Sequence, residues 1–297
     1  MIVILGNKGS LGSLLSSFLS VNYSVVGIDI DKVDLSKYED YEQHFTELFD
    51  FNLKNIVIIN CVGVMGAKES ELNPYIYYEI NGVVPFRLKQ FFDSKLKRYL
   101  FIQISSETVY GKSINNQQVF NEDDICAPQH VYGLSKLISE QLLKSTQNTN
   151  GTTLILRAPI ILFKDQKYPN ALTHIYSEIN LKGSATLFGA GEHRRKYILA
   201  HHFAQDVENL IGCWAKDSAK FDSCEVLNMP GIEISTKEFV DFLLREDKLK
   251  FEIKFKDNAK LAFSLLSSSM KFSLITGYTN SDDSVDSLMQ WVRKINE

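Results

Sequence analysis

The sequence lacks several features that would place it in other classes of protein. It has no run of about 18 apolar residues, the length that a membrane-spanning helix needs. Its first residues lack the basic segment and the longer apolar run of a signal peptide. Its basic residues are scattered, and its formal net charge is −4. We therefore expect a cytoplasmic protein that binds neither nucleic acid nor a membrane.

Metal and redox motifs are also missing. The cysteines show no C-x-x-C spacing, which argues against the common zinc-binding and redox motifs. His201 and His202 are adjacent, but no further His, Cys or Asp cluster accompanies them. We expect no metal site and free thiols, as in a reducing compartment. The cysteines are Cys61, Cys126, Cys213 and Cys224.

Short apolar runs, by contrast, recur through the first half of the chain and alternate with helix-like stretches. Such nearly continuous apolar strands are typical of a parallel sheet whose two faces are both covered by helices. The alternation predicts an α/β fold with a doubly wound parallel sheet. The runs are IVIL (2–5), SVVGI (24–28), NIVIINCV (55–62), YLFIQIS (99–105) and TTLILRA (152–158).

The alternation weakens after Arg157, where prolines interrupt irregular stretches. We expect a first domain over residues 1–160 and a smaller lobe over residues 161–297. The boundary is soft, because late elements can return to the main sheet. Ligands of such folds bind at the carboxyl edge of the strands, so the smaller lobe is expected to close over that edge.

The stretch ILGNKGSLG places Gly6, Gly9 and Gly12 between an apolar run and a helix-like run. A strand, a glycine turn and a helix N-terminus together present free backbone N–H groups to an anion. The pattern predicts a dinucleotide pyrophosphate site that includes Ser10 and Leu11. A plain turn between strand and helix is the alternative interpretation.

An acidic residue ends the second apolar run, in GIDID. A carboxylate there can accept hydrogen bonds from the adenosine ribose hydroxyls and would repel the 2′-phosphate of NADP. Asp29 is the candidate, with Asp31 as a weaker competitor, and Lys32 is the nearest following cation. We therefore expect NAD as the cofactor and NAD binding by residues 1–160. The alternative is a solvated strand-end carboxylate.

Two further stretches carry groups that can move a proton. In VYGLSK, Tyr132 and Lys136 are four residues apart and share one face of a helix. A nearby ammonium can lower the pKa of a phenol, so that it exchanges a proton with a substrate hydroxyl. Ser106 follows the run YLFIQI and can orient the reacting oxygen. The alternatives are an ordinary amphipathic helix and a turn-forming serine.

In this order, the motifs resemble those of the extended short-chain dehydrogenase/reductases, the NAD-dependent epimerase/dehydratase family. The resemblance extends over nearly the whole chain and is strongest up to residue 160. It implies a Rossmann domain, NAD, a catalytic Ser–Tyr–Lys triad and further cofactor contacts. The matching positions are GNKGSLG, Asp29, Asp34-Leu35, Cys61-Val62-Gly63, Asn81, Ser106, Tyr132 and Lys136.

The same resemblance implies a nucleotide-sugar substrate, a homodimer built from the helices over 75–96 and 130–146, and a role in polysaccharide synthesis. In the second lobe, Arg195 falls where the family contacts the nucleotide diphosphate, and Asn170 is a candidate for the sugar pocket. Glu107 and Thr108, directly after Ser106, are further candidate substrate contacts.

The chain also departs from the family pattern. Lys196 stands where the family usually has Asp, and Glu107-Thr108 replaces the Asp-Glu pair of the 4,6-dehydratases. Other features are mixed between UDP-galactose 4-epimerases and dTDP-4-dehydrorhamnose reductases. We expect an NAD-dependent 4-epimerase acting on a nucleotide-linked hexose. The alternatives are a 4-keto reductase, a 4-dehydrogenase, or a non-catalytic NAD-binding regulatory protein.

Overall fold

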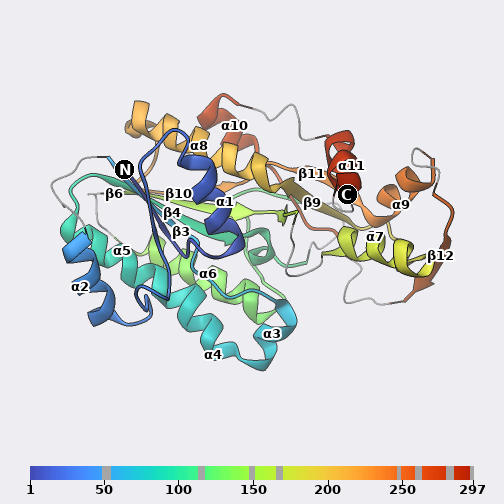
Figure 1. The fold of residues 1–297 in the computed structure, drawn as a ribbon, viewed down its shortest axis with the longest axis horizontal. Helices are drawn as coiled ribbons and strands as arrows, with labels where there is room; N and C mark the ends of the chain where they lie inside the picture. Colours follow the sequence, from blue (N-terminus) through green and yellow to red (C-terminus); the bar gives the residue numbers. More distant parts are fainter. Residues whose placement is uncertain are drawn as a thin grey trace.

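The structure is a computed structural model and describes residues 1–48, 55–112, 118–146, 151–164, 170–245, 249–257, 263–278 and 284–294. A six-stranded parallel sheet forms its centre, with the strand order β10-β6-β4-β3-β1-β2 (Figure 1). This confirms the expected doubly wound α/β fold. The strands are β1 (Ile2–Leu5), β2 (Val25–Ile28), β3 (Ile56–Asn60), β4 (Tyr99–Ser106), β6 (Gly151–Ala158) and β10 (Cys224–Asn228).

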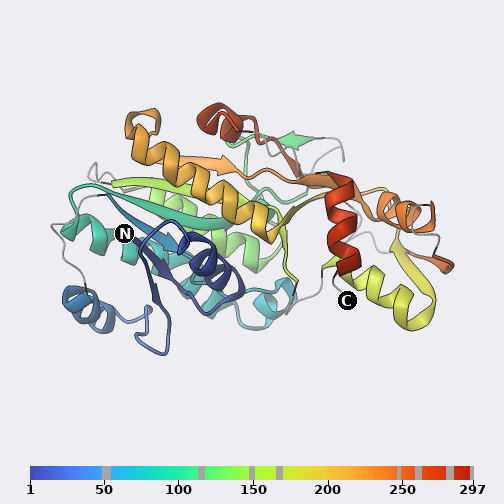
Figure 2. The same ribbon diagram turned by 45° about the horizontal axis from the view of Figure 1, so that its top comes forward.

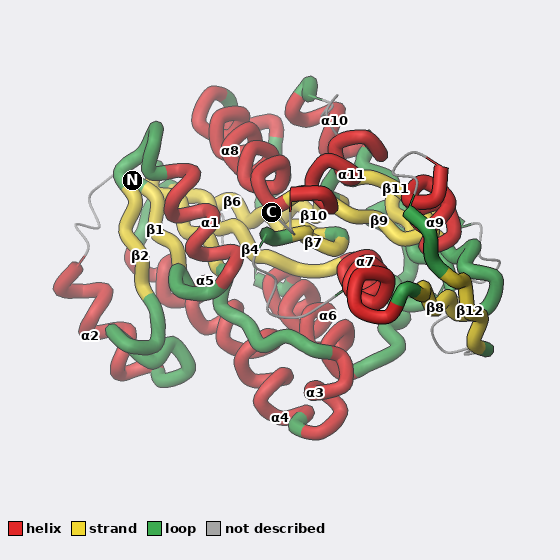
Figure 3. Tube along the Cα trace, turned by 45° about the vertical axis from the view of Figure 1, so that its right-hand side comes forward, coloured by secondary structure: helices red, strands yellow, loops and turns green. Residues whose placement is uncertain are grey.

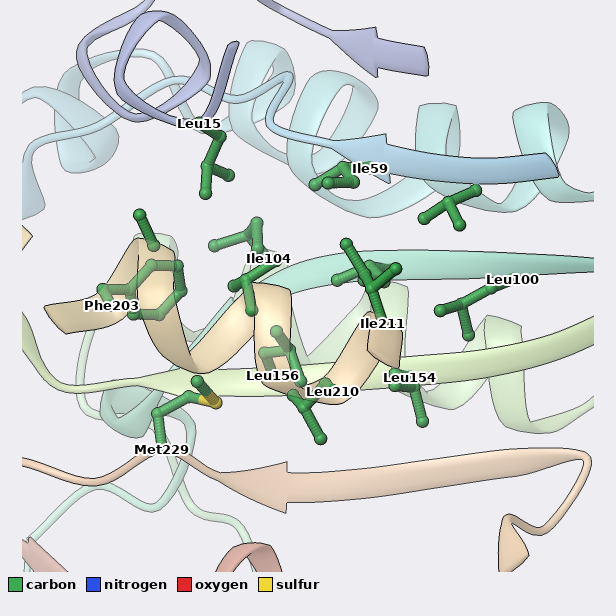
Figure 4. Close-up of a cluster of buried hydrophobic side chains, with 14 of the residues drawn as sticks. Leu15, Ile59, Leu100, Ile104, Leu154, Leu156, Phe203, Leu210, Ile211 and Met229 are labelled. Carbon is green, nitrogen blue, oxygen red and sulfur yellow. The ribbon is translucent and has the colours of Figure 1, made fainter. Parts of the chain in front are cut away.

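Helices cover both faces of this sheet, which explains the nearly continuous apolar runs in its strands. In β1, Ile2 and Ile4 face one core, whereas Val3 and Leu5 face the other. Figure 4 shows the first core, where side chains from α1 and α8 pack over those of the strands. One face carries α1 (Ser10–Leu19), α8 (Ala200–Lys216) and α10 (Met270–Thr276); the other carries α2 (Tyr38–Leu48), α5 (Val84–Lys95) and α6 (Val131–Lys144).

Two late elements belong to this central layer. β10 pairs in parallel with β6, and α8 lies across the sheet beside α1 (Figure 2). Segments from beyond residue 160 therefore do return to the main sheet. The free backbone edge of β6 is covered as a result, and the sheet gains its sixth strand.

The remaining late elements form a second lobe with its own apolar core, on the right of Figure 1 and in front in Figure 3. Its small sheets have the orders β11-β9-β7 and β12-β8. The elements are β7 (Ile160–Leu162), α7 (Ala171–Lys182), β8 (Ser184–Phe188), β9 (Arg194–Leu199), β11 (Ile232–Ser235), α9 (Thr236–Arg245), β12 (Glu252–Lys256) and α11 (Val285–Lys294).

Short elements connect the two parts. The strands β5 (Val119–Phe120) and β13 (Leu266–Ser267) pair with each other, and Leu265 forms a β-bridge with Arg195 of β9. The remaining short elements of the structure are α3 (Ala67–Leu72), α4 (Pro74–Tyr77), the π-helical turn η1 (Tyr78–Val83) and the 3₁₀ turns η2 (Glu107–Val109) and η3 (Ser218–Lys220). Among the described residues, none of the helices has the length and apolarity that crossing a membrane requires.

Candidate active site

The glycine turn lies between β1 and α1 and is closely packed on its inner side. A Cβ atom on Gly12 would come within 2.1 Å of the Gly6 carbonyl oxygen, and Gly6 itself has a φ of +78°. Gly9 is different, because its Cβ would meet only one atom within 4 Å, at 3.4 Å. Gly9 also caps α1 without a side-chain hydrogen bond. The turn thus leaves room beside a helix N-terminus, which suits a pyrophosphate.

Asp29 lies directly beside this turn. Its carboxylate accepts hydrogen bonds from the backbone N–H of Lys8 (2.7 Å) and of Ile30 (2.8 Å). The Lys8 ammonium pairs instead with Asp31 (2.7 Å), and the Lys32 ammonium donates to the Gly27 carbonyl (2.8 Å). Both nearby cations therefore have partners within the protein, which agrees with a site for NAD.

The other predicted adenosine contacts follow a short loop. Asp34 accepts hydrogen bonds from the backbone N–H (3.0 Å) and the hydroxyl (2.7 Å) of Ser36, and these bonds lower the pKa of its carboxyl group. Leu35 is buried against the core under α2. The loop is thus fixed locally, with the Asp34 carboxylate half-buried at its surface.

Asn81 fixes the turn that follows β3. Its side-chain oxygen accepts from the Val64 N–H (2.8 Å), and its amide donates to the Val64 carbonyl (3.0 Å) and to the Ser135 hydroxyl (3.1 Å). Asn81 is fully buried in η1, and a Cβ on Gly63 would come within 3.0 Å of its oxygen. It therefore joins the turn over Cys61, Val62 and Gly63 to α6, which carries Tyr132 and Lys136.

The first turn of α6 is capped by three side chains. The N–H groups of Val131, Tyr132 and Gly133 donate to Glu71 (2.9 Å), to the Ser70 hydroxyl (3.1 Å) and to His130 Nδ1 (3.0 Å), respectively. These bonds satisfy donors that a helix N-terminus otherwise leaves free. The backbone of Tyr132 is consequently held in place by α3 as well as by its own helix.

The Tyr132 phenol lies close enough to the Ser106 side chain for the serine to affect its pKa. Burial raises the pKa of Tyr132 to about 12, Ser106 lowers it, and the neighbouring Tyr77 raises it. The Tyr77 ring meets the Tyr132 ring edge-on at 6.5 Å. Ser106 also accepts from the Thr108 hydroxyl (3.0 Å) and from the Thr108 N–H (3.3 Å).

Lys136 lies beneath these groups, between β4 and the turn after β3. Its ammonium donates to the Ile104 carbonyl (3.0 Å) and lies 3.4 Å from the place of a Cβ on Gly63. Burial lowers the pKa of Lys136 to about 8, and the neighbouring Cys61 and Glu140 raise it. The structure thus gathers Ser106, Tyr132 and Lys136 at the carboxyl end of β4, near the glycine turn.

The predicted substrate contacts have different environments. Glu107 is buried. Its carboxylate lies 3.6 Å from the Lys196 ammonium and accepts a hydrogen bond from the Ser267 hydroxyl. Arg195 stacks on Phe263 at 4.1 Å, and its buried Nη1 atom has no hydrogen-bond partner among the described residues. Asn170 caps α7 through the N–H groups of Leu172 (2.9 Å) and Thr173 (3.1 Å).

Several contributors to this site were not anticipated from sequence. Ser70, Ser135 and Tyr77 reach Tyr132 or Asn81 from other elements, and Lys196 and Ser267 enclose Glu107. Ser135 lies within the stretch VYGLSK, so its place could have drawn attention. Lys196 was noted only as a departure from the family pattern. Ser70, Tyr77 and Ser267 carry no local signal, because only the folded chain brings them near.

Comparisons with known proteins bear on this geometry. The model of the family described as "NAD dependent epimerase/dehydratase family" matches residues 2–211. The UDP-glucose 4-epimerase of Vibrio cholerae is 27% identical over 251 residues, which are 80% of this chain and 73% of that protein.

Two solved structures show the same fold at lower identity. The dTDP-4-dehydrorhamnose reductase of Clostridium acetobutylicum has a TM-score of 0.79 and 17% identity, over 100% of this chain and 99% of that one. MoeE5 in complex with UDP-glucose and NAD has a TM-score of 0.73 and 19% identity, over 100% and 99% of the two chains.

Proposed function

Because the chain belongs to the NAD-dependent epimerase/dehydratase family, we propose that it is a nucleotide-sugar 4-epimerase that retains its NAD during turnover. The observation that carries the proposal is the Tyr132–Ser106 pair above the buried Lys136, at the sheet edge where the glycine turn also lies. The similarity to a UDP-glucose 4-epimerase supports the choice of reaction.

The residues of the first domain, residues 1–160 in our proposed division, suit NAD. The open room at Gly9, with Ser10 and Leu11 in the first turn of α1, would take the pyrophosphate. Asp29 would hold the adenosine ribose, Asp34 and Leu35 would lie against the adenine, and the turn after β3 would flank the cofactor. When bound there, NAD would supply the hydride acceptor and donor for C4 of the sugar.

Tyr132 is the proposed acid and base. It would remove the proton of the C4 hydroxyl and later return a proton to the same oxygen, which Ser106 would hold by a hydrogen bond. A phenol with a pKa of about 12 is a poor base at neutral pH. The Lys136 ammonium would lower that pKa and would also bind the nicotinamide ribose. Its buried position near the end of β4 supports the second of these roles.

The second lobe offers a place for the diphosphate. Arg195 presents a buried N–H group without a partner among the described residues, and a guanidinium binds phosphate oxygens well. Asn170 and Thr108 remain candidate sugar contacts. Both side chains also form hydrogen bonds within the protein, Asn170 with the N–H of Leu172 and Thr108 with the hydroxyl of Ser106. Glu107, the carboxylate that follows Ser106 in sequence, is paired with Lys196 and is therefore not free to promote dehydration.

A second candidate function is a 4-keto reductase or 4-dehydrogenase, which would use the same residues for one half of the epimerase cycle. The similarity in fold to a dTDP-4-dehydrorhamnose reductase favours this alternative. A non-catalytic NAD-binding protein is less well supported, because such a protein has no need of the complete Ser106, Tyr132 and Lys136 set.

The proposal includes a homodimer and a place in polysaccharide synthesis. Exposed apolar side chains lie on α4 and α6, namely Tyr75 (85% exposed), Ile76 (50%) and Leu134 (39%). Two copies could bury them in a four-helix interface. Light scattering of the purified protein would give twice the chain mass for a dimer, and the single-chain mass would refute it.

The cofactor released on heat denaturation of the freshly purified protein tests the main proposal. We expect about one equivalent of NAD or NADH per chain and interconversion of UDP-glucose and UDP-galactose without added cofactor. Protein without bound NAD that oxidises added NADH with a 4-keto sugar would be a reductase. Retained NAD without turnover of any UDP-, dTDP- or GDP-sugar would favour the non-catalytic alternative.

A further inference from the structure

A buried ion pair joins the catalytic turn to the second lobe. Glu107 of η2 lies 3.6 Å from the ammonium of Lys196 in β9, and their side chains are 6% and 2% exposed. The Lys196 ammonium also donates to the Ser267 carbonyl (2.7 Å), and the Ser267 hydroxyl donates to Glu107. Glu107 follows Ser106 in sequence, and Lys196 follows Arg195. The pair therefore connects the reacting end of the proposed site with its diphosphate end.

Arg195 is a second cation that acts on this carboxylate. Burial raises the pKa of Glu107, whereas Lys196 and, to a smaller extent, Arg195 lower it. Burial likewise lowers the pKa of Arg195, whereas Tyr197 and Glu107 raise it. Nevertheless, the described part of the chain gives Arg195 no ion pair, and its buried Nη1 atom has no hydrogen-bond partner. One buried carboxylate thus faces two cations, and the lysine is the one that holds it.

We infer that Lys196 is a positioning residue, which engages Glu107 and so keeps Arg195 free to bind the diphosphate of the substrate. This inference rests on the proposed function. An arginine–carboxylate contact is strong and often bidentate, so an unengaged Glu107 would be a favourable partner for Arg195. A buried carboxylate that loses its lysine is also strongly driven to find another cation.

Lys196→Met tests this role directly. We expect its dissociation constant for UDP, measured by calorimetry, to rise roughly ten- to hundredfold, the loss that follows when a hydrogen bond to a charged group is no longer made. The KM for UDP-glucose should rise with it, whereas kcat should change less, because Tyr132 and Ser106 are untouched. NAD content should stay the same.

The double variant E107Q/K196M separates positioning from structure. Without the carboxylate, Arg195 has no competing partner, so UDP affinity should return to within about threefold of the original protein. Lys196→Arg, which keeps a positive charge beside Glu107, should likewise bind UDP with an affinity close to that of the original protein. Lys196→Gln provides a second uncharged variant and keeps a donor for the Ser267 carbonyl, in case the Met variant does not fold.

Lys89→Met is the matched control. Lys89 pairs with Asp93 on α5 (2.6 Å) and is equally buried, at 1% exposure, but it lies away from the proposed site. Its loss should lower the melting temperature without weakening UDP binding. Unchanged UDP affinity in K196M, or a loss that the double variant does not restore, would overturn the inference alone. If the original protein binds none of UDP, dTDP and GDP, the proposed nucleotide-sugar function fails first, and the inference fails with it.

Discussion

At the scale of single residues, the candidate site rests on one phenol. Replacing Tyr132 by Phe removes the hydroxyl and leaves the ring. We expect kcat for UDP-glucose to fall by about 10² to 10⁴, the usual contribution of a general acid–base group. The NAD released on denaturation should not change. Tyr77→Phe is the control. It removes a hydroxyl that donates to the Met65 carbonyl (2.5 Å), so kcat should fall far less than in Y132F. Unaltered turnover in Y132F would refute the role of Tyr132.

Lys136 leads to a prediction about stability and pH. Burial lowers its pKa from 10.5 to about 8, so the folded protein resists the charged form. The free energy of unfolding is reduced by the cost of burying this charge, and the whole of that cost is present below pH 8. It disappears as the pH rises from 8 to 10.5, because the unfolded chain then binds more protons than the folded one. The shift corresponds to roughly 3 kcal/mol.

The variant Lys136→Met should therefore be stabilised relative to the original protein at pH 7, when both lack added cofactor. That advantage should shrink toward pH 10. Urea unfolding at the two pH values measures it. An advantage that does not vary with pH would mean that the charge of Lys136 is not the cause.

At the scale of elements, the turn between β1 and α1 has little room for side chains. Gly12→Ala would place a Cβ within 2.1 Å of a backbone oxygen, so we expect it to lose bound NAD and about 1–3 kcal/mol of stability. Gly212→Ala, in α8, is the matched control, since nothing lies within 4 Å of the new methyl group. It should stabilise the protein by up to about 1 kcal/mol. Thermal unfolding and cofactor release distinguish the two.

The elements also show what sequence could predict. The five expected strands of the first half are present within a residue or two, because burial on both faces requires apolar side chains at successive positions. The expected single helix over 75–96 is instead α4, η1 and α5. The π-helical turn that sets Asn81 between Val64 and Ser135 has no sequence signal, since tertiary hydrogen bonds determine it.

The site shows the same division between local and long-range signals. Ser106, Tyr132 and Lys136 could be found because each follows a recognisable strand or lies at a helical spacing. The partner of Glu107 could not, because Lys196 comes from a β9 strand that no periodicity placed beside η2. Lys196 drew attention only as a departure from the family pattern.

At the scale of the whole molecule, one buried cluster joins the late elements to the early ones. Arg157 of β6 binds Glu140 of α6 (2.7 Å), the Tyr110 hydroxyl (2.7 Å) and the Glu122 carbonyl (3.0 Å). Asn228 of β10 accepts a bond from the same Tyr110 hydroxyl (2.7 Å). The Arg157 and Glu140 side chains are almost completely buried.

Arg157→Met should therefore destabilise the whole protein by about 3–5 kcal/mol, because Glu140 would be left as an unpaired buried charge. Arg87→Met, which breaks a half-exposed pair with Glu79, should cost less than about 1 kcal/mol. Denaturant unfolding of both variants makes the comparison. Similar losses would mean that the buried cluster is not what holds these elements together.

The place of β10 at the edge of the central sheet has a consequence for the synthesis of the protein. The ribosome releases β6 well before β10, yet β10 is the strand that covers the open edge of β6. Until residue 228 has emerged, the nascent chain exposes that edge. The buried cluster of Tyr110 and Arg157 then lacks the hydrogen bond from Tyr110 to Asn228. Chaperones should therefore bind the nascent chain mainly in the interval between the synthesis of β6 and that of β10. A fragment that stops at residue 160 would keep the edge of β6 exposed permanently.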